Sequence, residues 1–390
     1  MMRGPAYLAY RHARHNMVTS AILVACIALT TALPISARLL FARYAQSLTE
    51  RAHATPLVAG ARGSRFDLTL ATTHFRRAQV QPATMELMDR IEALHLGTAI
   101  PMSVTHTARG YVVVGTGIEY AELRRFRYAQ GSWPVELGQC VLGSRVAARE
   151  SLKVGDHIFS DQSDLYDISK PPAIRMSIVG VLEPTGGPDD DVVFVDIATA
   201  WAIAGILHGH DAARTVRDPN LVLQQTGDNI AISGALIEYN EVTPETIDSY
   251  HMHADPAKLP ITSVLVVPKD HKSATLLTTE INLSKTEQMV RPAEVMQELL
   301  SYVLRVRSVI DAVSVAMIAT NVALAVLILV LDYRARAGER RVLLRIGSAR
   351  GVVPMMFGLE FVGLMALGVV VAGLLALVAA EAAPDIVSML

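Results

Sequence analysis

Three long apolar runs divide the chain into segments of very different character. Residues 17–40, 308–331 and 353–380 each contain one charged residue, and each is long enough to cross about 30 Å of hydrocarbon as a helix. No apolar run of that length occurs between the first and the second. The pattern predicts three transmembrane helices, with one large water-soluble region, 41–291, inserted between the first two.

Short runs of β-branched residues, bounded by Gly, Pro and Asp, recur through this inserted region. Such runs are typical of strands, and the longer periodic stretches between them are typical of helices. The texture therefore predicts an α+β domain. The predicted strands are Tyr111–Gly115, Arg175–Leu182, Val192–Val195 and Ser263–Val267, and the predicted helices are Met85–Leu94 and Ser144–Ser151.

Two further segments of the inserted region differ from this texture. Residues 205–260 are polar and rich in Asp, Asn, Thr and Pro, which predicts a variable insertion or a long loop. After Pro292, apolar positions recur at spacings of three and four residues. We expect 292–307 to form a stalk helix that continues into the second span.

Composition hides this division, because half of the residues are hydrophobic while the net charge is only −2. The charged residues at the N-terminus are all basic. Residues 1–16 contain three arginines and two histidines but no acid, which predicts a cytoplasmic, amphipathic N-terminus. A cleaved signal peptide is the alternative, but no small-residue cleavage site precedes a polar segment, so 17–40 is interpreted as an uncleaved anchor.

Cys26 falls in an apolar run and Cys140 in the soluble region, and we expect no disulfide between them.

The most basic short stretch, 332–352, lies between the second and third spans. Six arginines face only Asp332 and Glu339, and aliphatic residues alternate with them at near-helical spacing. Positive charge next to a span marks the cytoplasmic side, so this stretch is predicted to be a cytoplasmic loop with a short amphipathic helix.

The spacing of particular residues in and after this loop carries a resemblance. Glu360 follows Gly347 by thirteen positions, and Gly368 follows Glu360 by eight. This arrangement resembles the permease signature of the FtsX/MacB/LolC family of ABC transporters. An ordinary positive-inside loop is the alternative reading. The residues that match the signature are Arg336, Glu339, Leu343, Arg345, Gly347, Arg350 and Glu360.

The resemblance implies an α-helical membrane protein whose large extracytoplasmic α+β domain, a MacB-like periplasmic core domain, lies between spans 1 and 2. It implies the bacterial inner membrane, and a coupling element at 332–352 on which a separate ATP-binding subunit docks. Glu360 would fix the base of this element by pairing with the loop arginines. A second permease, identical or paralogous, membrane lipid and a periplasmic protein would be further partners. The family has a fourth span that this sequence lacks, so either the sequence is truncated or 381–390 is an extracytoplasmic tail after three spans.

Motifs for catalysis are missing from the sequence. It contains no G-x-x-x-x-G-K-[ST] phosphate loop, no G-x-S-x-G elbow and no H-E-x-x-H helix. We therefore expect no enzyme activity in this chain, ATP bound only by the partner subunit, and no nucleic-acid partner. The carboxylate run Asp189–Asp191 lacks the alternating ligands of a calcium loop and is interpreted as a solvated turn before a strand.

Two H-x-H pairs are the only candidate metal ligands. They consist of His208 with His210 and of His251 with His253. Alternate residues of an extended chain point the same way, so either pair could offer two nitrogens to zinc. The alternative, histidines on a surface loop, leaves the chain without a cofactor of its own, and this is the expectation that we carry forward.

Taken together, the sequence predicts a permease subunit that couples ATP hydrolysis by its partner to movement of the outer domain, for export, extraction of lipid or lipoprotein, or mechanotransmission. The low number of polar residues in the spans fits transmission of force better than conduction of a solute. Two alternatives stand beside this prediction. One is a regulatory membrane protein that activates a periplasmic partner and transports nothing, and the other is a membrane-anchored metal-binding module.

Overall fold

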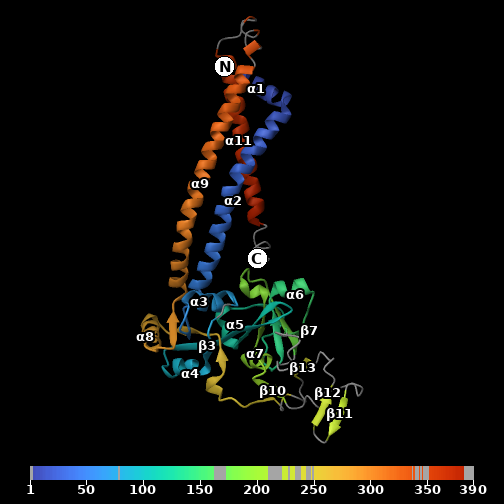
Figure 1. Cartoon of the computed structure of the whole chain (residues 1–390), viewed down its shortest axis with the longest axis vertical. Helices are drawn as coiled ribbons and strands as arrows, with labels where there is room; N and C mark the ends of the chain where they lie inside the picture. The colour runs from blue at the N-terminus through green and yellow to red at the C-terminus, as the bar shows by residue number, and fades with distance from the viewer. Residues whose placement is uncertain are drawn as a thin grey trace. The chain divides into compact units, whose positions relative to one another are not determined.

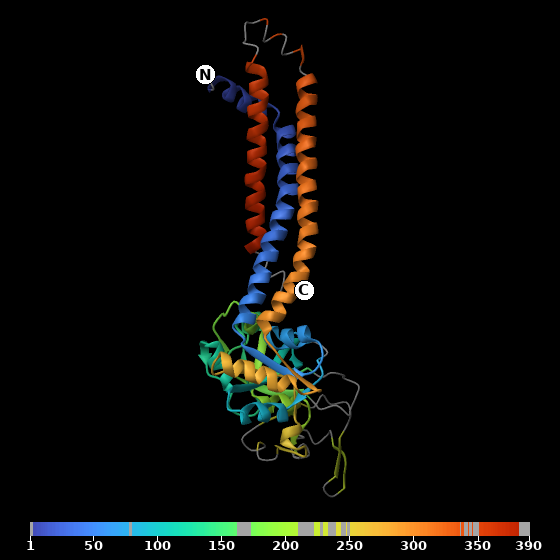
Figure 2. The same cartoon turned by 90° about the vertical axis from the view of Figure 1, so that its left-hand side faces the viewer.

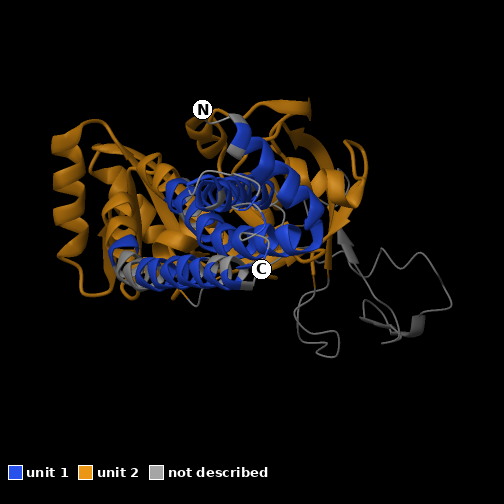
Figure 3. Cartoon of the chain, turned by 90° about the horizontal axis from the view of Figure 1, so that it is seen from above, with its two compact units in different colours: residues 1–48, 300–390 blue, residues 49–299 orange. Residues whose placement is uncertain are grey.

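The computed structural model describes residues 3–77, 80–161, 173–209, 222–226, 229–232, 239–242, 250–335 and 351–381, with the single positions 247, 337, 338, 342 and 345. The chain divides into two compact units (Figure 3). Unit 1 comprises Met1–Leu48 and Leu300–Leu390, and unit 2 comprises Thr49–Leu299.

Unit 1 consists of helices. They are α1 (Arg3–His15), α2 (Met17–His53), α9 (Pro292–Ala335) and α11 (Val352–Glu381). Within unit 1, α2, α9 and α11 run side by side (Figures 1 and 2). The last turns of α2 and the first turns of α9 belong to unit 2, so both helices cross the boundary between the units without a break.

Among the described residues, two helical stretches are long and apolar enough to cross a membrane, Met17–Leu40 and Pro354–Ala379. They lie within α2 and α11, where the first and third spans were predicted. In α9 the apolar stretch identified, Asp311–Leu324, is shorter. The second span, and with it the three-span topology, stays a prediction.

A small residue and an ion pair contribute to the contacts of α2 with α9 and α11 in unit 1. The Arg38 Nε atom donates to Asp311 Oδ1 at 2.8 Å, which links α2 to α9. Gly368 of α11 packs on Ile27 so closely that a Cβ atom at position 368 would meet the isoleucine side chain. Small side chains are what allows helix backbones to approach in this way.

Unit 2 is built on a mixed sheet. In the described part of the chain it has the strand order β13-β8-β6-β9-β4-β3-β16-β1-β17, with β5 and β7 paired to β8 beside this path. All four predicted strands form part of it. The strands are β1 (Leu57–Ala61), β3 (Gly97–Ala108), β4 (Tyr111–Thr116), β5 (Tyr128–Gly131), β6 (Gln139–Leu142), β7 (His157–Phe159), β8 (Ala173–Leu182), β9 (Val192–Val195), β13 (Tyr239–Glu241), β16 (Ser263–Pro268) and β17 (Glu287–Val290).

Short strand pairs and helices complete unit 2. The pairs are β2 (Ala83–Thr84) with β15 (Pro260–Ile261), β10 (Leu207–Gly209) with β14 (Tyr250–Met252), and β11 (Val222–Thr226) with β12 (Asn229–Ile232). The α-helices are α3 (Arg65–His74), α4 (Met85–Ala93), α5 (Ile118–Arg124), α6 (Ser144–Glu150), α7 (Ile197–Ile203) and α8 (His271–Asn282), and the 3-10 turns include η1 (Pro188–Asp191) and η5 (Pro256–Lys258). Helices α4 and α6 were both predicted. Cys140 is buried in β6, and Cys26 is exposed on α2.

The two helices that leave unit 2 are attached to neighbouring strands. Helix α2 leads into β1, and β17 leads into α9, while β1 and β17 pair antiparallel at the end of the strand order. Val58 of β1, Val290 of β17 and Val295 of α9 share one small hydrophobic cluster. Both helices are therefore connected to the same edge of the sheet.

Candidate functional site

The last turn of α2 carries a mostly buried arginine that is paired with a carboxylate far away in the sequence. Arg51 Nη1 lies 2.6 Å from Asp189 Oδ2, and Arg51 Nη2 lies 2.7 Å from Asp189 Oδ1. The arginine also donates from Nε to the carbonyl of Thr73 at 3.0 Å. Only 13% of the Arg51 side chain and 2% of the Asp189 side chain are exposed. A bidentate ion pair that is shielded from water in this way fixes both the position and the orientation of the Arg51 side chain relative to Asp189.

Aromatic rings surround this pair. Tyr120 of α5 is fully buried; its hydroxyl donates to Asp189 Oδ1 at 3.0 Å and accepts from Arg51 at 2.7 Å. Its ring contacts Phe75, Phe126 and Phe194. Burial, followed by the charge of Asp189, raises the pKa of Tyr120 to about 12, so the hydroxyl remains protonated and available as a donor at neutral pH.

A second arginine donates hydrogen bonds to the residues just after α2. Arg124 of α5 donates to the carbonyl of Ala54 at 3.0 Å and to the hydroxyl of Thr55 at 2.8 Å. Its guanidinium group lies over the Tyr120 ring, 5.3 Å from the centroid. Cations are favourable at a helix C-terminus, where carbonyl groups lack partners. Arg51, Tyr120, Arg124 and Asp189, which we call the α2 anchor, thus bind the end of α2 to α5 and η1.

The prediction of a solvated turn at Asp189–Asp191 is wrong. Asp190 is 1% exposed, and it accepts hydrogen bonds from the backbone of Thr185 and Gly186, each at 2.8 Å. Arg145 of α6 binds both Asp190 and Asp191. Every carboxylate of the run therefore has a cationic partner, and burial is possible because those partners come from α2 and α6.

His74, at the end of α3, lies beside the α2 anchor and is expected to make unit 2 sensitive to acid. Burial, followed by the charge of Arg51, lowers the pKa of His74 to about 4 from its ordinary 6.5. Because the folded pKa is the lower one, the unfolded chain binds the proton more readily between pH 6.5 and 4. Stability should therefore fall as pH decreases through this window, by roughly 2 kcal/mol from this residue.

Tryptophan fluorescence can follow this loss in the full chain, because both tryptophans, Trp133 and Trp201, are buried in unit 2. Urea midpoints would be compared at pH 7 and pH 5 for the wild type and for His74→Asn, which keeps a polar group but does not titrate. The variant should lose less stability between these pH values, while the exposed control His95→Asn should behave as the wild type. Equal losses in wild type and His74→Asn would contradict the assignment.

Most of the predicted coupling element lies outside the described residues. Arg336, Glu339, Leu343, Gly347 and Arg350 belong to this part, and Arg345 is described as an exposed helical position. Its role in docking stays a prediction.

Glu360 is described, and its partner is a residue that sequence reasoning did not single out. His12 of α1 places its Nδ1 atom 2.7 Å from Glu360 Oε2, and both side chains are mostly buried. The His12 ring also packs edge-on against Phe357, with the centroids 5.6 Å apart. Pairing of Glu360 with arginines 336, 340, 341 and 350 stays a prediction, because these lie outside the described residues.

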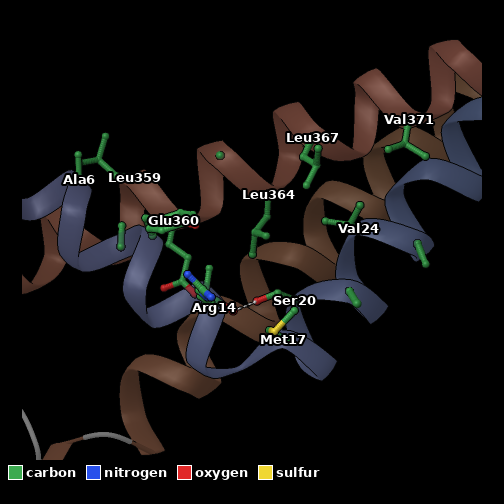
Figure 4. A pocket seen from close by; sticks show the side chains of 16 residues that line it. Ala6, Arg14, Met17, Ser20, Val24, Leu359, Glu360, Leu364, Leu367 and Val371 are labelled. Atoms are coloured by element: carbon green, nitrogen blue, oxygen red, sulfur yellow. Dashed lines mark hydrogen bonds between the residues drawn. The ribbon is translucent and has the colours of Figure 1, made fainter.

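An apolar groove of about 880 Å³ lies next to this pair, lined by α1, α2 and α11 (Figure 4). Arg14 of α1 and Glu360 of α11 form part of its wall. Leu364, Leu367 and Val24 line it as well (Figure 4). Helix α1, the basic segment that was predicted to be amphipathic, therefore contacts α11 through His12 and lies along part of its N-terminal half.

The two histidine pairs come together in part. Strand β10 pairs with β14 so that His208 lies opposite His251, whereas His210 lies outside the described residues. His251 is half-buried and His253 is exposed. Among the side chains that the structure describes, no three His, Cys, Asp or Glu residues form a set able to hold a metal ion.

Sequence reasoning missed Arg51, Tyr120 and His12. Arg51 stands in a polar, mixed-charge stretch like many others, and its partner is 138 residues away. One available signal was the position of Arg51 in the last turn of a long helix, where a cation is favourable.

Comparisons with known proteins bear on the first predicted span and most of the inserted region. The family model of the MacB-like periplasmic core domain matches residues 16–233. The chain is similar to the periplasmic region of MacB from Actinobacillus actinomycetemcomitans, with 10% identity, a TM-score of 0.36, and coverage of 65% of this chain and 97% of that one. It is also similar to the extracellular domain of the noncanonic ABC-type transporter YknZ from Gram-positive bacteria, with 8% identity, a TM-score of 0.33, and coverage of 60% and 98%. No curated protein sequence matches the chain.

Proposed function

The chain belongs to the MacB/FtsX-like family of ABC transporter permeases, which the match over residues 16–233 establishes, and on this premise we propose that it transmits force. In this proposal a separate subunit binds and hydrolyses ATP on the cytoplasmic side of the bacterial inner membrane. The permease passes the resulting movement to its extracytoplasmic domain. The chain spans the membrane three times, pairs with a second permease, and has no ATPase activity of its own.

The observation that carries the proposal is the α2 anchor. Helix α2 is continuous from Met17 to His53, so the apolar stretch Met17–Leu40 and the buried Arg51 belong to one element. A movement of this helix along its axis would displace Asp189 and the η1 turn together with it, since a two-pronged buried ion pair resists sliding. Pro34 removes one backbone hydrogen bond inside α2 and is the position where we expect it to bend.

The second support is the shared root of α2 and α9. Because β1 and β17 are paired neighbours, a relative movement of the two helices acts directly on one edge of the sheet. Arg51 then carries the same movement into η1, which precedes β9 near the middle of the strand order. Packed elements of this kind shift as rigid bodies and do not deform gradually.

The cytoplasmic input is proposed to be the loop 332–352. Its arginines and Glu339 would form a charged contact surface for the ATP-binding subunit. Leu343 would pack into an apolar recess of that subunit. His12 and Glu360 would tie α1 to α11 at the base of this loop, so that a push on the loop is shared by the N-terminal helix.

We expect the double charge reversal Arg336→Glu with Arg345→Glu to abolish recovery of the complex when the permease is co-purified with its ATP-binding subunit. Loss of two interfacial cations and gain of two anions should weaken binding by at least about a hundredfold. A matched control, Arg62→Glu with Arg65→Glu, reverses two charges in unit 2 and should leave the complex intact.

Two outcomes would contradict the proposal. One is a wild-type permease that binds no ATP-binding subunit, and the other is a loop variant that binds as well as the wild type. A complex that forms normally but stimulates no change in tryptophan fluorescence on ATP addition would refute force transmission to unit 2 while leaving the docking site in place.

A further inference from the structure

A polar cleft of about 550 Å³ lies in unit 2, beside the place where β17 leads into α9. Its walls come from the residues that follow β1, the start of α3, one face of α8, β17 and the first turns of α9 (Figure 1). We call it the α8 cleft. Ten of the thirteen described residues that line it are polar or charged, and its volume is that of a small-molecule site. A ligand that fills the α8 cleft must therefore be small and polar.

Three arginines line the α8 cleft, and one of them is held in place without an acidic partner. Arg62 Nη2 donates to the carbonyl oxygens of Asn282 and Ser284, at 3.1 and 2.6 Å, where α8 ends. Among the described residues, no carboxylate forms an ion pair with Arg62. A guanidinium group has five N–H donors in one plane, so the two bonds to α8 orient the group and leave three donors for a ligand.

The other two arginines, Arg65 and Arg291, are paired only weakly. Arg65 Nη2 lies 3.2 Å from Glu298 Oε2, and Arg291 Nη1 lies 3.4 Å from Glu294 Oε1. The Arg65 side chain is 54% exposed, and that of Glu294 is 69% exposed. Exposed ion pairs stabilise a protein little, so a ligand can exchange them at small cost. The cleft therefore offers cationic donors that are already close to their binding positions.

A row of hydroxyl groups lines the cleft along α8. Thr275, Thr278 and Thr279 recur at spacings of three and four residues, which places them on one face of the helix. Each hydroxyl donates its proton to the carbonyl group four residues earlier, at 3.0, 2.7 and 2.8 Å. A hydroxyl group whose proton is used in this way can only accept further hydrogen bonds. This face of α8 therefore suits a ligand that carries several donors spaced along its length.

We propose that the α8 cleft binds an acidic carbohydrate, a sugar that carries a carboxylate or a phosphate group. The acidic group would accept charge-assisted hydrogen bonds from Arg62 and Arg291, whose planar guanidinium groups match both kinds of anion. The sugar hydroxyl groups would donate to the threonine oxygens of α8. Glu294 and Glu298 also line the cleft, and they would accept from sugar hydroxyl groups but would repel a simple inorganic anion.

A bound sugar would connect α8 to the first turns of α9. Because β17 leads into α9 and pairs with β1, the ligand would act on the edge of the sheet to which α2 and α9 are connected. The α8 cleft nevertheless shares no residue with the α2 anchor or with the loop 332–352. Sugar binding is therefore independent of the proposed force transmission and can be tested on the permease without its ATP-binding subunit.

Calorimetric titration of the full chain, in a detergent without a sugar headgroup, tests the proposal. The probes are glucuronate, which carries a carboxylate, and glucose 6-phosphate. We expect at least one of them to bind with a Kd below about 5 mM, and the tighter one identifies the preferred acidic group. Arg62→Gln and Arg291→Gln should each weaken this binding by at least about tenfold, because each removes a charged donor.

Two further variants separate the parts of the site. Thr279→Val keeps the shape of the side chain but removes the hydroxyl acceptor, and it should weaken binding by about threefold or more. Arg109→Gln changes a 44% exposed arginine that is paired with Glu150 outside the cleft, and it should bind as the wild type does. Arg62 also binds the end of α8, so urea unfolding followed by tryptophan fluorescence would be run on its variant. Arg291→Gln leaves that contact in place and tests the site independently.

The proposal is overturned if neither sugar binds with a Kd below about 5 mM, or if both arginine variants retain full affinity, since the ligand would then lie elsewhere. Binding of neutral glucose as tightly as glucuronate and glucose 6-phosphate would equally overturn it, because the arginines would then not recognise the acidic group. Binding of inorganic phosphate as tightly as glucose 6-phosphate would show a simple anion site that does not use the threonines of α8.

Discussion

Arg51→Ala is expected to destabilise unit 2 by about 3–5 kcal/mol, the largest loss that we predict for any single side chain. The substitution leaves Asp189 ionised at 2% exposure and without its cation, and among the described residues the Tyr120 hydroxyl is the hydrogen-bond partner that remains to its carboxylate. The cost is therefore that of an uncompensated buried charge, and it exceeds what the intact pair contributes. Urea unfolding of the full chain, followed by Trp133 and Trp201, measures it, since both belong to unit 2.

Asp189→Asn should cost a comparable amount, because it leaves the guanidinium group of Arg51 buried without a counter-charge. If the two groups act as one unit, the double variant should lose clearly less than the sum of the single losses. The control is Arg65→Ala, which removes an arginine paired with Glu298 but about half exposed. An exposed pair contributes less than about 1 kcal/mol, so this variant should unfold almost as the wild type does. A loss below about 1 kcal/mol for Arg51→Ala would contradict the α2 anchor.

Gly143→Ala is expected to have the second largest effect, a destabilisation of about 2–3 kcal/mol. Gly143 precedes α6, and a Cβ atom there would collide with the backbone carbonyl groups of Asp189 and Asp190. Backbone atoms cannot relieve a clash by changing rotamer, as a flexible side chain can, so η1 would have to move. That movement would pull Asp189 away from Arg51, and the steric cost would be added to a weakened ion pair.

A second glycine serves as the control for this prediction. Gly63 lies in the same unit, and no heavy atom stands within 4 Å of the place where its Cβ atom would be. Gly63→Ala should therefore change the free energy of unfolding by less than about 0.5 kcal/mol. If Gly143→Ala is equally mild, the close approach of η1 to position 143 does not constrain the α2 anchor.

These two variants also separate stability from function. Arg51→Ala and Gly143→Ala disturb the same anchor from opposite sides, one on α2 and the other at η1. Under the proposed function both should retain binding to the ATP-binding subunit, whose docking loop they do not touch. Both should reduce the ATP-dependent change in tryptophan fluorescence, because the link from α2 to η1 is what each of them weakens.

The elements of this protein could be predicted from its sequence because local patterns decide them. Length and apolarity predicted Met17–Leu40 and the stretch within α11, which form helices long and apolar enough to cross a membrane, and β-branched runs located β4, β8, β9 and β16. The spacing of residues between Arg336 and Gly368 pointed to the permease family, and the match of the family model confirmed that membership. In each case the information lies within one helix, strand or loop.

The partners of charged and polar residues were decided only by the tertiary structure. A run of three carboxylates resembles any exposed turn until Arg51 and Arg145 arrive from other elements, and Glu360 gave no sign of His12, which is 348 residues away. Likewise, only the register of β10 and β14 sets position 208 opposite position 251, which neither H-x-H motif indicates by itself. The physical reason is the same in all three cases. Hydropathy and propensity act along the chain, whereas burial of a charge depends on which distant group the fold brings within hydrogen-bonding distance.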